Sequence, residues 1–413
     1  MQTTFIALSV FLLIILLLVS LLLYARQRLV PQGNVELRIN GGERTLQVSA
    51  GGSLLASLAN SKIFLSSACG GGGSCGLCRC RVMSGGGGIL PTEQGFFSRQ
   101  QQQQGWRLAC QVKVRERMEV AIPEAILGVK KWECEVVSNR NVATFIKEFV
   151  VKLPAGETLQ FKSGGFVQVD VPPCEVNYAR DLSVEPQFRE DWDRMKIWEL
   201  KMKNSAPTYR AYSMANHPAE GNIVMLNVRI ATPPWDKAAG AFAGVNPGVC
   251  SSYIFSRKAG DKVNISGPYG EFFLRDTSSE KMFIGGGAGM APMRSHIFHL
   301  FHTLRTGCKV TFWYGARSLR EVFYEEDFRA IEKKFPNFRF TIALSDPLQT
   351  DGWTGPTGFI HQVIYDQYLK SHDAPEDVEY YLCGPPMMTA AATTMLYNLG
   401  VPNEMVMYDN FGG

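Results

Sequence analysis

The hydropathy pattern begins with the run FIALSVFLLIILLLVSLLLY at residues 5–24, which is almost continuously apolar. A helix needs about 20 such residues to cross the hydrocarbon core of a membrane. A secretory signal would have basic residues before the run and a small-residue cleavage site after it, whereas MQTT precedes this run and ARQR follows it. The pattern therefore predicts an uncleaved transmembrane helix. Arg26 and Arg28 follow the span, so we expect the bulk of the chain on the cytoplasmic side of the membrane.

Two kinds of periodicity follow this segment. NVELRIN (34–40) and RTLQVSA (44–50) alternate as strands around a glycine turn, and residues 53–65 have the pattern of a short amphipathic helix. After residue 128 come strand-like runs, at 130–139, 144–153, 164–172, 221–230 and 261–274. Several short strands separated by turn signals predict an antiparallel β-barrel.

Residues 174–207 interrupt these strands with a charged and aromatic segment that is longer than a barrel loop should be. We interpret it as an insertion that is helical around FREDWDRMKIWEL (188–200), and the sequence indicates no function for it.

From about residue 276 strands and helices alternate. Strand-like runs occur at 281–286, 309–316, 338–344, 378–384 and 404–411, and the helical patterns between them lie at about 292–304, 320–335, 358–369 and 386–399. Such alternation predicts a parallel sheet covered by helices. The chain is thus predicted to be multidomain: an anchor and linker at 1–32, a small domain at 33–128, a barrel at 129–275 and an α/β domain at 276–413.

Two turns of the α/β domain have the composition of a dinucleotide site. GGGAGMAP (285–292) joins the first strand to a helix, where a phosphate can approach backbone amides and the helix N-terminus. CGPPMM (383–388) follows a later strand, at the edge where the crevice of such a sheet lies. The alternatives are a tight turn and a core cysteine. The candidate nucleotide-binding residues are Gly285, Gly286, Gly287, Gly289, Pro292, Cys383 and Gly384.

Cysteines cluster in SACGGGGSCGLCRC (67–80), which holds four of the ten in the chain. A chain of 413 residues with 46% hydrophobic residues does not need disulfide staples to build a core. The spacing C-x5-C-x2-C differs from the paired CxxC of zinc sites and is close to the C-x4-C-x2-C of plant-type ferredoxins. Zinc and an unliganded glycine-rich loop are the alternatives. We assign Cys69, Cys75, Cys78 and Cys110 to a 2Fe-2S cluster.

Two further patterns are given structural interpretations. Cys80 lies two residues after Cys78, and in an extended segment it is expected to pack as a thiol. His296, His299 and His302 recur at every third residue, but no carboxylate or cysteine accompanies them, so we expect packing rather than metal binding. The net charge of +4 and the lack of a basic cluster with aromatics do not indicate a nucleic-acid partner.

The cysteine loop and its flanking strands resemble the β-grasp fold of ferredoxins. RAYSMAN (210–216) resembles the R-x-Y-S motif of the ferredoxin-NADP reductase superfamily. The resemblance implies that Arg210 binds the pyrophosphate of FAD, Tyr212 packs on the isoalloxazine and Ser213 hydrogen-bonds N5. GVCSSY (248–253) follows in family order and implies diphosphate contacts through Gly248, Cys250, Ser251 and Ser252. The resemblance places Cys383 near the nicotinamide C4, so Ser213 and Cys383 are the candidate catalytic residues.

The complete order of modules, ending in YDNFGG, resembles the family of F subunits of the Na+-translocating NADH:quinone oxidoreductases. This implies a place in the bacterial inner membrane, with NADH, FAD and a 2Fe-2S centre acting in that order and other membrane subunits reducing quinone and exporting Na+. It also implies that residues near Phe411 cover the flavin until nicotinamide displaces them. Two alternatives stay open. One is the reductase component of a bacterial mono- or dioxygenase, and the other is a membrane-tethered redox carrier or sensor that does not turn over NADH.

Overall fold

The computed structural model describes residues 2–29, 33–236, 238 and 240–409, so Phe411 lies outside the described residues. The chain forms two compact units that divide between Val129 and Lys130, with Ala68–Gly70 counted in the second unit.

The first unit begins with helix α1 (Gln2–Leu29), which contains the apolar run expected at residues 5–24. All side chains from Val10 to Leu21 are exposed. Judged on its described residues alone, no helix of the structure meets the length and hydropathy of a membrane span. The transmembrane anchor therefore stays a prediction.

The rest of the first unit is a mixed five-stranded sheet in the order β2-β1-β5-β3-β4. Strands β1 and β2 form the expected hairpin, and β1 pairs with β5 in parallel. Leu37 and Ile39 alternate inward from β1 and pack with Leu54 and Leu58 of α2. The elements are β1 (Asn34–Ile39), β2 (Arg44–Ser49), α2 (Leu54–Asn60), β3 (Arg79–Ser84), α3 (Pro91–Gln94), α4 (Arg99–Gln103), β4 (Trp106–Leu108), β5 (Met118–Ala121) and α5 (Glu124–Leu127).

The second unit begins with six antiparallel strands in the order β11-β8-β15-β6-β7-β12. The edge strands β11 and β12 meet at a bridge between Met214 and Leu226, which closes the sheet into the predicted barrel. Its strands are β6 (Lys130–Ala143), β7 (Ile146–Lys152), β8 (Phe166–Val171), β11 (Thr208–Ser213), β12 (Ile223–Arg229) and β15 (Lys262–Tyr269).

The insertion lies between β8 and β11 and is only partly helical. A two-stranded ribbon of β9 (Cys174–Asn177) and β10 (Lys201–Asn204) encloses the short helices α6 (Tyr178–Asp181) and α7 (Arg189–Arg194). After β12 come a small ribbon of β13 (Trp235–Asp236) and β14 (Ala241–Phe242), and then helix α8 (Val249–Phe255).

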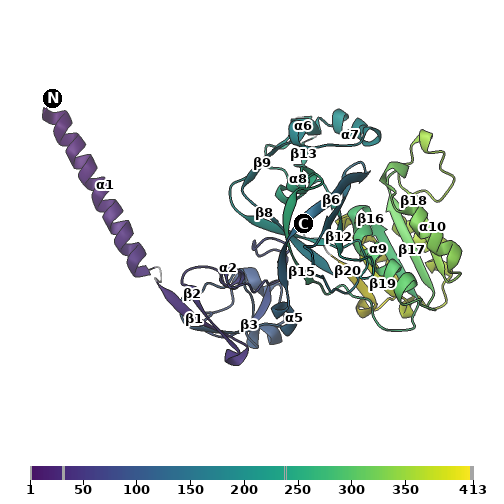
Figure 1. The fold of residues 1–413 in the computed structure, drawn as a ribbon, viewed down its shortest axis with the longest axis horizontal. Coiled ribbons are helices and arrows are strands. Elements are labelled where there is room, and N and C mark those ends of the chain that lie inside the picture. The colour runs from purple at the N-terminus through teal and green to yellow at the C-terminus, as the bar shows by residue number, and fades with distance from the viewer. Residues whose placement is uncertain (1, 30–32, 237, 239, 410–413) are drawn as a thin grey trace. The chain divides into compact units, whose positions relative to one another are not determined.

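The C-terminal part of the second unit is a five-stranded parallel sheet in the order β18-β17-β16-β19-β20, as its alternating pattern predicts (Figure 1). Its strands are β16 (Lys281–Gly286), β17 (Val310–Ala316), β18 (Phe338–Leu344), β19 (Glu379–Cys383) and β20 (Val406–Asp409). Phe283 of β16 packs with α9 (Met290–Phe298) and α10 (Glu325–Lys334) on one face of the sheet. Met282 and Ile284 pack on the other face with α11 (Ile360–Gln367) and α12 (Pro386–Asn398).

Several expected helix boundaries differ from the structure, and the helix expected at 320–335, for example, begins at Glu325. The helix expected at about 292–304 begins at Met290 and ends as a π-helical turn over His299–Thr303. The helix expected at 53–65 is confined to α2, because Lys62 takes a left-handed conformation with φ of 62° and the chain then leaves the helix.

Candidate functional site

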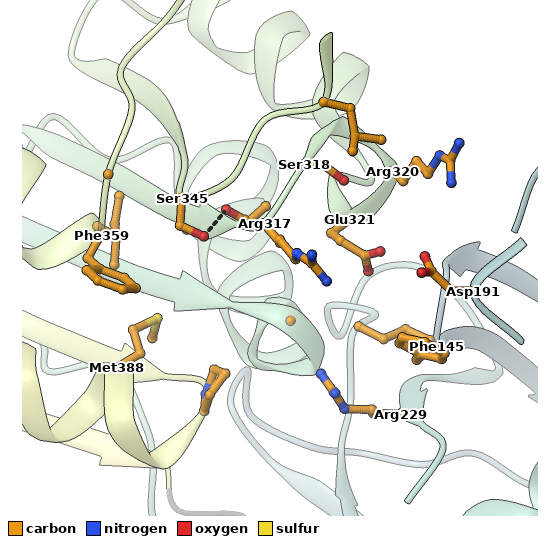
Figure 2. A pocket seen from close by; sticks show the side chains of 18 of the residues that line it. Phe145, Asp191, Arg229, Arg317, Ser318, Arg320, Glu321, Ser345, Phe359 and Met388 are labelled. Atoms are coloured by element: carbon orange, nitrogen blue, oxygen red, sulfur yellow. Dashed lines mark hydrogen bonds between the residues drawn. The ribbon is translucent and has the colours of Figure 1, made fainter. Parts of the chain in front are cut away.

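A cavity of about 610 Å³ lies where the carboxyl ends of β16, β17 and β18 meet the barrel (Figure 2). The sheet contributes the turn at Gly287 and the segments that follow β17 and β18. The barrel contributes the β6–β7 turn, the end of β12 and, unexpectedly, helix α7 of the insertion. The carboxyl edge of a doubly wound parallel sheet is where such folds bind dinucleotides, so this cavity is the candidate nucleotide site.

The glycine turn that follows β16 brings a helix N-terminus close to the neighbouring strand. Gly285 pairs in register with Cys383 of β19. A Cβ atom on Gly289 would collide with the carbonyl group of Cys383 and lie 2.8 Å from the amide nitrogen of Gly384. Only glycine fits this approach. The turn therefore places the start of α9 against the end of β19, although Pro292 lies inside α9 rather than in the turn.

Four arginines line the cavity, and three of them are paired with carboxylates. Arg317 Nη2 lies 3.0 Å from Asp346 Oδ2, and Arg320 Nη1 lies 2.6 Å from Glu190 Oε2. Arg194 pairs with Asp191 of the same helix.

Arg229, at the end of β12, has its guanidinium 6.0 Å from the centre of the Phe145 ring. Figure 2 shows the side chains of Arg229, Arg317 and Glu321 converging on the cavity. Burial raises the pKa of Glu321, and the nearby Asp191 acts in the same direction.

The R-x-Y-S segment forms strand β11 of the barrel. Arg210 donates from Nη1 to the carbonyl of Tyr209 at 2.8 Å and to Thr208 Oγ1 at 3.2 Å. Burial raises the pKa of Tyr212 well above its ordinary value. Ser213 is buried and its Oγ donates to Asp409 Oδ2 at 2.6 Å.

Asp409 connects the two predicted catalytic residues. It ends β20, where it pairs in register with Cys383 of β19. Its carboxylate also accepts a hydrogen bond from the hydroxyl of Ser213 in the barrel. Burial raises the pKa of Asp409, while the hydrogen bond from Ser213 acts in the opposite direction. Cys383 is completely buried, which raises the pKa of its thiol well above the ordinary value. Sequence reasoning missed Asp409, although it lies within the C-terminal YDNFGG stretch.

GVCSSY is helical, whereas its sequence predicts a glycine turn with available hydroxyls. Ser252 Oγ donates to the carbonyl of Gly248 at 2.7 Å and contacts the hydroxyl of Tyr178 at 2.7 Å. Ser251 Oγ also donates to Gly248 and accepts the amide N–H of Ala231, both at 3.1 Å. Because the chain itself engages both hydroxyls, the amides at the start of α8 are the donors that a diphosphate would meet. Cys250 is buried within this helix.

The cysteine loop of the first unit has backbone geometry suited to wrapping a cluster. Gly71, Gly73 and Gly76 have φ values of 90°, 82° and 70°, which side chains rarely adopt. The carbonyl of Cys78 accepts the amide N–H of Ala109 at 2.8 Å, which fixes Cys110 beside it.

The thiols of Cys78 and Cys110 are in hydrogen-bond contact. That bond and burial raise the pKa of Cys78 well above its ordinary value. Iron would therefore have to displace thiol protons, as thiolate ligation requires. Within the described residues, no three His, Cys, Asp or Glu side chains are grouped so as to hold a single metal ion. The loop glycines and the contact between the Cys78 and Cys110 thiols are compatible with the predicted 2Fe-2S site, to which Cys69 and Cys75 are also assigned.

The thiol of Cys80 and the side chains of His296 and His302 occupy different environments. Cys80 is fully buried, and its Sγ lies 3.9 Å from the carbonyl of Arg107, in the packed position expected for it. His296 is completely buried, and its Nδ1 lies 3.3 Å from Ser163 Oγ. His302, on the same helix, is exposed.

Sequence reasoning also missed the contact that fastens the barrel to the parallel sheet. Arg294 of α9 forms two bonds with the Glu220 carboxylate, at 2.7 and 2.8 Å, and donates to the carbonyl of Ala215 at 2.9 Å. Arg294 is nearly buried, so this contact keeps the barrel and the nucleotide sheet in one unit.

Comparison with protein families reproduces the order of the three modules. A 2Fe-2S iron-sulfur cluster binding domain matches residues 37–115, an oxidoreductase FAD-binding domain matches 196–274 and an oxidoreductase NAD-binding domain matches 283–394. The F subunit of the Na(+)-translocating NADH-quinone reductase of Methylococcus capsulatus is 56% identical over 400 residues, which cover 97% of each chain. The chain belongs to this family of F subunits. The Pseudomonas aeruginosa member is 52% identical over 99% of this chain and 98% of its own.

Solved structures share the fold at lower identity. The ferredoxin reductase of a carbazole 1,9a-dioxygenase is 23% identical, with a TM-score of 0.59 over 92% of this chain and 98% of its own. The FAD/NAD-binding domain of a Vibrio cholerae nitric oxide dioxygenase is 20% identical, with a TM-score of 0.51 over 68% of this chain and 99% of its own. These likenesses show the fold alone, while the identity to the quinone reductase family favours that reading over an oxygenase reductase.

Proposed function

We propose that the chain is the NADH-oxidising subunit of a Na+-translocating NADH:quinone reductase, in which it passes electrons from NADH to membrane subunits that reduce quinone. FAD supplies the central chemistry, because a flavin accepts a hydride and releases electrons singly to a one-electron centre. The bond between Ser213 and Asp409 carries this proposal. It joins the flavin-binding strand to the strand end beside Cys383, at the edge of the sheet that forms the nucleotide cavity.

Each cofactor has a proposed set of residues. Cys69, Cys75, Cys78 and Cys110 hold the 2Fe-2S cluster. Arg210, Tyr212 and the start of α8 hold FAD, with Ser213 at the reacting edge of the flavin. The glycine turn after β16 and the segment Cys383–Gly384 hold NADH. The planar guanidinium of Arg210 matches the geometry of a phosphate group. A hydroxyl beside the flavin can donate or accept a hydrogen bond, whichever the protonation state of the flavin requires.

The preference for NADH follows from how Arg317 is paired. An arginine just after the second strand of such a sheet can accommodate a 2′-phosphate. Here Asp346, at the end of the adjacent strand, binds that arginine through both Nε, at 3.1 Å, and Nη2, at 3.0 Å.

We further propose that α1 anchors the chain in the inner membrane with one pass. It has 28 residues, its described apolar side chains are exposed, and basic residues occur only at its C-terminal end. Removal of residues 1–29 should release the chain from carbonate-washed membranes while its FAD content stays unchanged. A truncated chain that stays in the membrane fraction would contradict the anchor.

Rapid mixing of the anaerobic chain with NADH tests the order of electron transfer. The proposal predicts that flavin absorbance bleaches first and that the iron-sulfur signal follows. A matched Cys75→Ala chain should bleach its flavin at the same rate and show no iron-sulfur signal. An iron-sulfur signal that appears before the flavin bleaches would contradict the proposed order.

A further inference from the structure

Helix α7 of the insertion is fixed against the barrel by buried contacts. Trp192 is fully buried, donates from Nε1 to the carbonyl of Thr144 at 2.7 Å and stacks on Phe255 with ring centres 6.1 Å apart. Before the helix, Glu185 accepts the amide N–H of Asn141 through both carboxylate oxygens at 3.1 Å. These contacts set the position of α7 independently of any charge on its other side.

Helix α7 lines the nucleotide cavity with Glu190, Asp191 and Arg194, of which Asp191 and Arg194 pair with each other. Figure 2 shows the Asp191 side chain at the edge of the cavity, near Glu321. Glu190 Oε2 lies 2.6 Å from Arg320 Nη1. Glu190 is 70% exposed and Arg320 is 35% exposed. An exposed ion pair of this kind contributes little to folding. It does neutralise the positive charge that Arg320 would otherwise present to the cavity.

Arg320 belongs to the segment where a nucleotide phosphate would be recognised. It follows β17, the second strand of the sheet, by four residues, and in dinucleotide-binding sheets an arginine in that region accommodates a 2′-phosphate. Arg317 in the same segment is paired by Asp346 from the sheet itself. Among the described residues, the ion-pair partner of Arg320 is Glu190, which the insertion supplies from outside the nucleotide domain.

We propose that the insertion is a specificity element for the nucleotide, in which Glu190 occupies Arg320 and so withholds it from a 2′-phosphate. This inference rests on the proposed NADH site and extends it to a residue of the barrel domain. A 2′-phosphorylated nucleotide has to displace Glu190 from Arg320, and the like-charge contact between its phosphate and the Glu190 carboxylate disfavours it. NADH carries no such group, so it does not have to break the pair.

The test is Glu190→Gln in the full-length, FAD-loaded chain. The amide keeps the size of the side chain and removes its charge. The ratio of kcat/KM for NADPH to that for NADH should rise by up to about fivefold, the factor that corresponds to the roughly 1 kcal/mol upper end for an exposed ion pair. Calorimetric titration should show tighter binding of 2′,5′-ADP and unchanged binding of 5′-ADP.

Glu175→Gln is the matched control. Glu175 lies on β9 of the same insertion, pairs with Lys203 at 2.9 Å and does not line the cavity, so its loss should leave the ratio unchanged. A Glu190→Gln chain with an unchanged ratio overturns the inference. Equal gains for both nucleotides also overturn it, because Arg320 would then meet a phosphate that NADH and NADPH share.

A blocking variant separates this inference from the proposed site. Ser345 is exposed at the rim of the cavity, so Ser345→Trp should fill the cavity while folding and FAD content stay normal. If that chain oxidises NADH at the normal kcat/KM, the nucleotide binds elsewhere, and both the site and the inference fail. If it does not oxidise NADH, and Glu190→Gln still leaves the ratio unchanged, only the inference fails.

Discussion

The close approach between α9 and β19 makes Gly289→Ala a sensitive test of the nucleotide site. The new Cβ would lie 2.8 Å from the amide nitrogen of Gly384, about 0.6 Å inside the ordinary contact limit of 3.4 Å, and would collide more severely with the Cys383 carbonyl. All of these atoms belong to the backbone, so no side-chain rotation can relieve the clash. The start of α9 must therefore move away from the end of β19, which separates the two proposed nucleotide-binding segments.

Overpacking of this kind costs about 1–3 kcal/mol of folding free energy. A displacement of about 1 Å between reacting groups can lower a rate by about 100-fold, so a shift of more than half that size should lower kcat/KM for NADH by about tenfold or more. The assay is anaerobic NADH oxidation with ferricyanide, with FAD content measured as a check that the barrel is intact. Gly307→Ala is the control, because its Cβ meets nothing within 4 Å and its φ is not left-handed. A Gly289→Ala chain within twofold of the control would refute this reasoning.

Three further predictions concern charge, pH and metal. Asp346→Asn removes the partner of the exposed Arg317, so the ratio of kcat/KM for NADPH to that for NADH should rise by up to about fivefold, and a ratio that stays constant in steady-state assays would count against the pairing. His296 is buried and its folded-state pKa is lowered to about 3, so the unfolded chain binds the extra proton below about pH 6.5 and stability falls with acidity. That loss is about 2 kcal/mol at pH 5 relative to pH 8, and denaturant unfolding of His296→Gln should show a correspondingly weaker dependence on pH. Cys75→Ala should abolish bound iron and acid-labile sulfide while FAD stays bound, and an iron content equal to that of the unsubstituted chain would exclude Cys75 as a ligand.

The sequence predicts most of the architecture because each module has its own periodicity. Alternation of period two indicates the barrel, and alternating strands and helices indicate the parallel sheet. Helix ends are less predictable. The helix that begins at Met290 ends in a π-helical turn, and α2 stops where Lys62 takes a left-handed conformation. Neither helix end is marked by a glycine or a proline in the sequence.

Contacts between distant parts of the chain were beyond reach of sequence reasoning. Ser213 and Asp409 are 196 residues apart, and no local pattern pairs them. Glu190 lies in an insertion that has no recognised motif, and its position on the cavity depends on how Trp192 packs into the barrel. GVCSSY is expected to form a glycine turn with available hydroxyls, and only the hydrogen bonds of the structure show that Ser251 and Ser252 are engaged by the chain itself.

The most direct test of the account is NADH-driven quinone reduction in membranes from cells with and without this chain, with Na+ concentration varied. The account predicts a Na+-stimulated activity that disappears without the chain, returns with the intact chain and does not return with Cys75→Ala. Activity that is unchanged by the loss of the chain, or that returns fully with Cys75→Ala, would contradict the claim that electrons enter the complex through this chain.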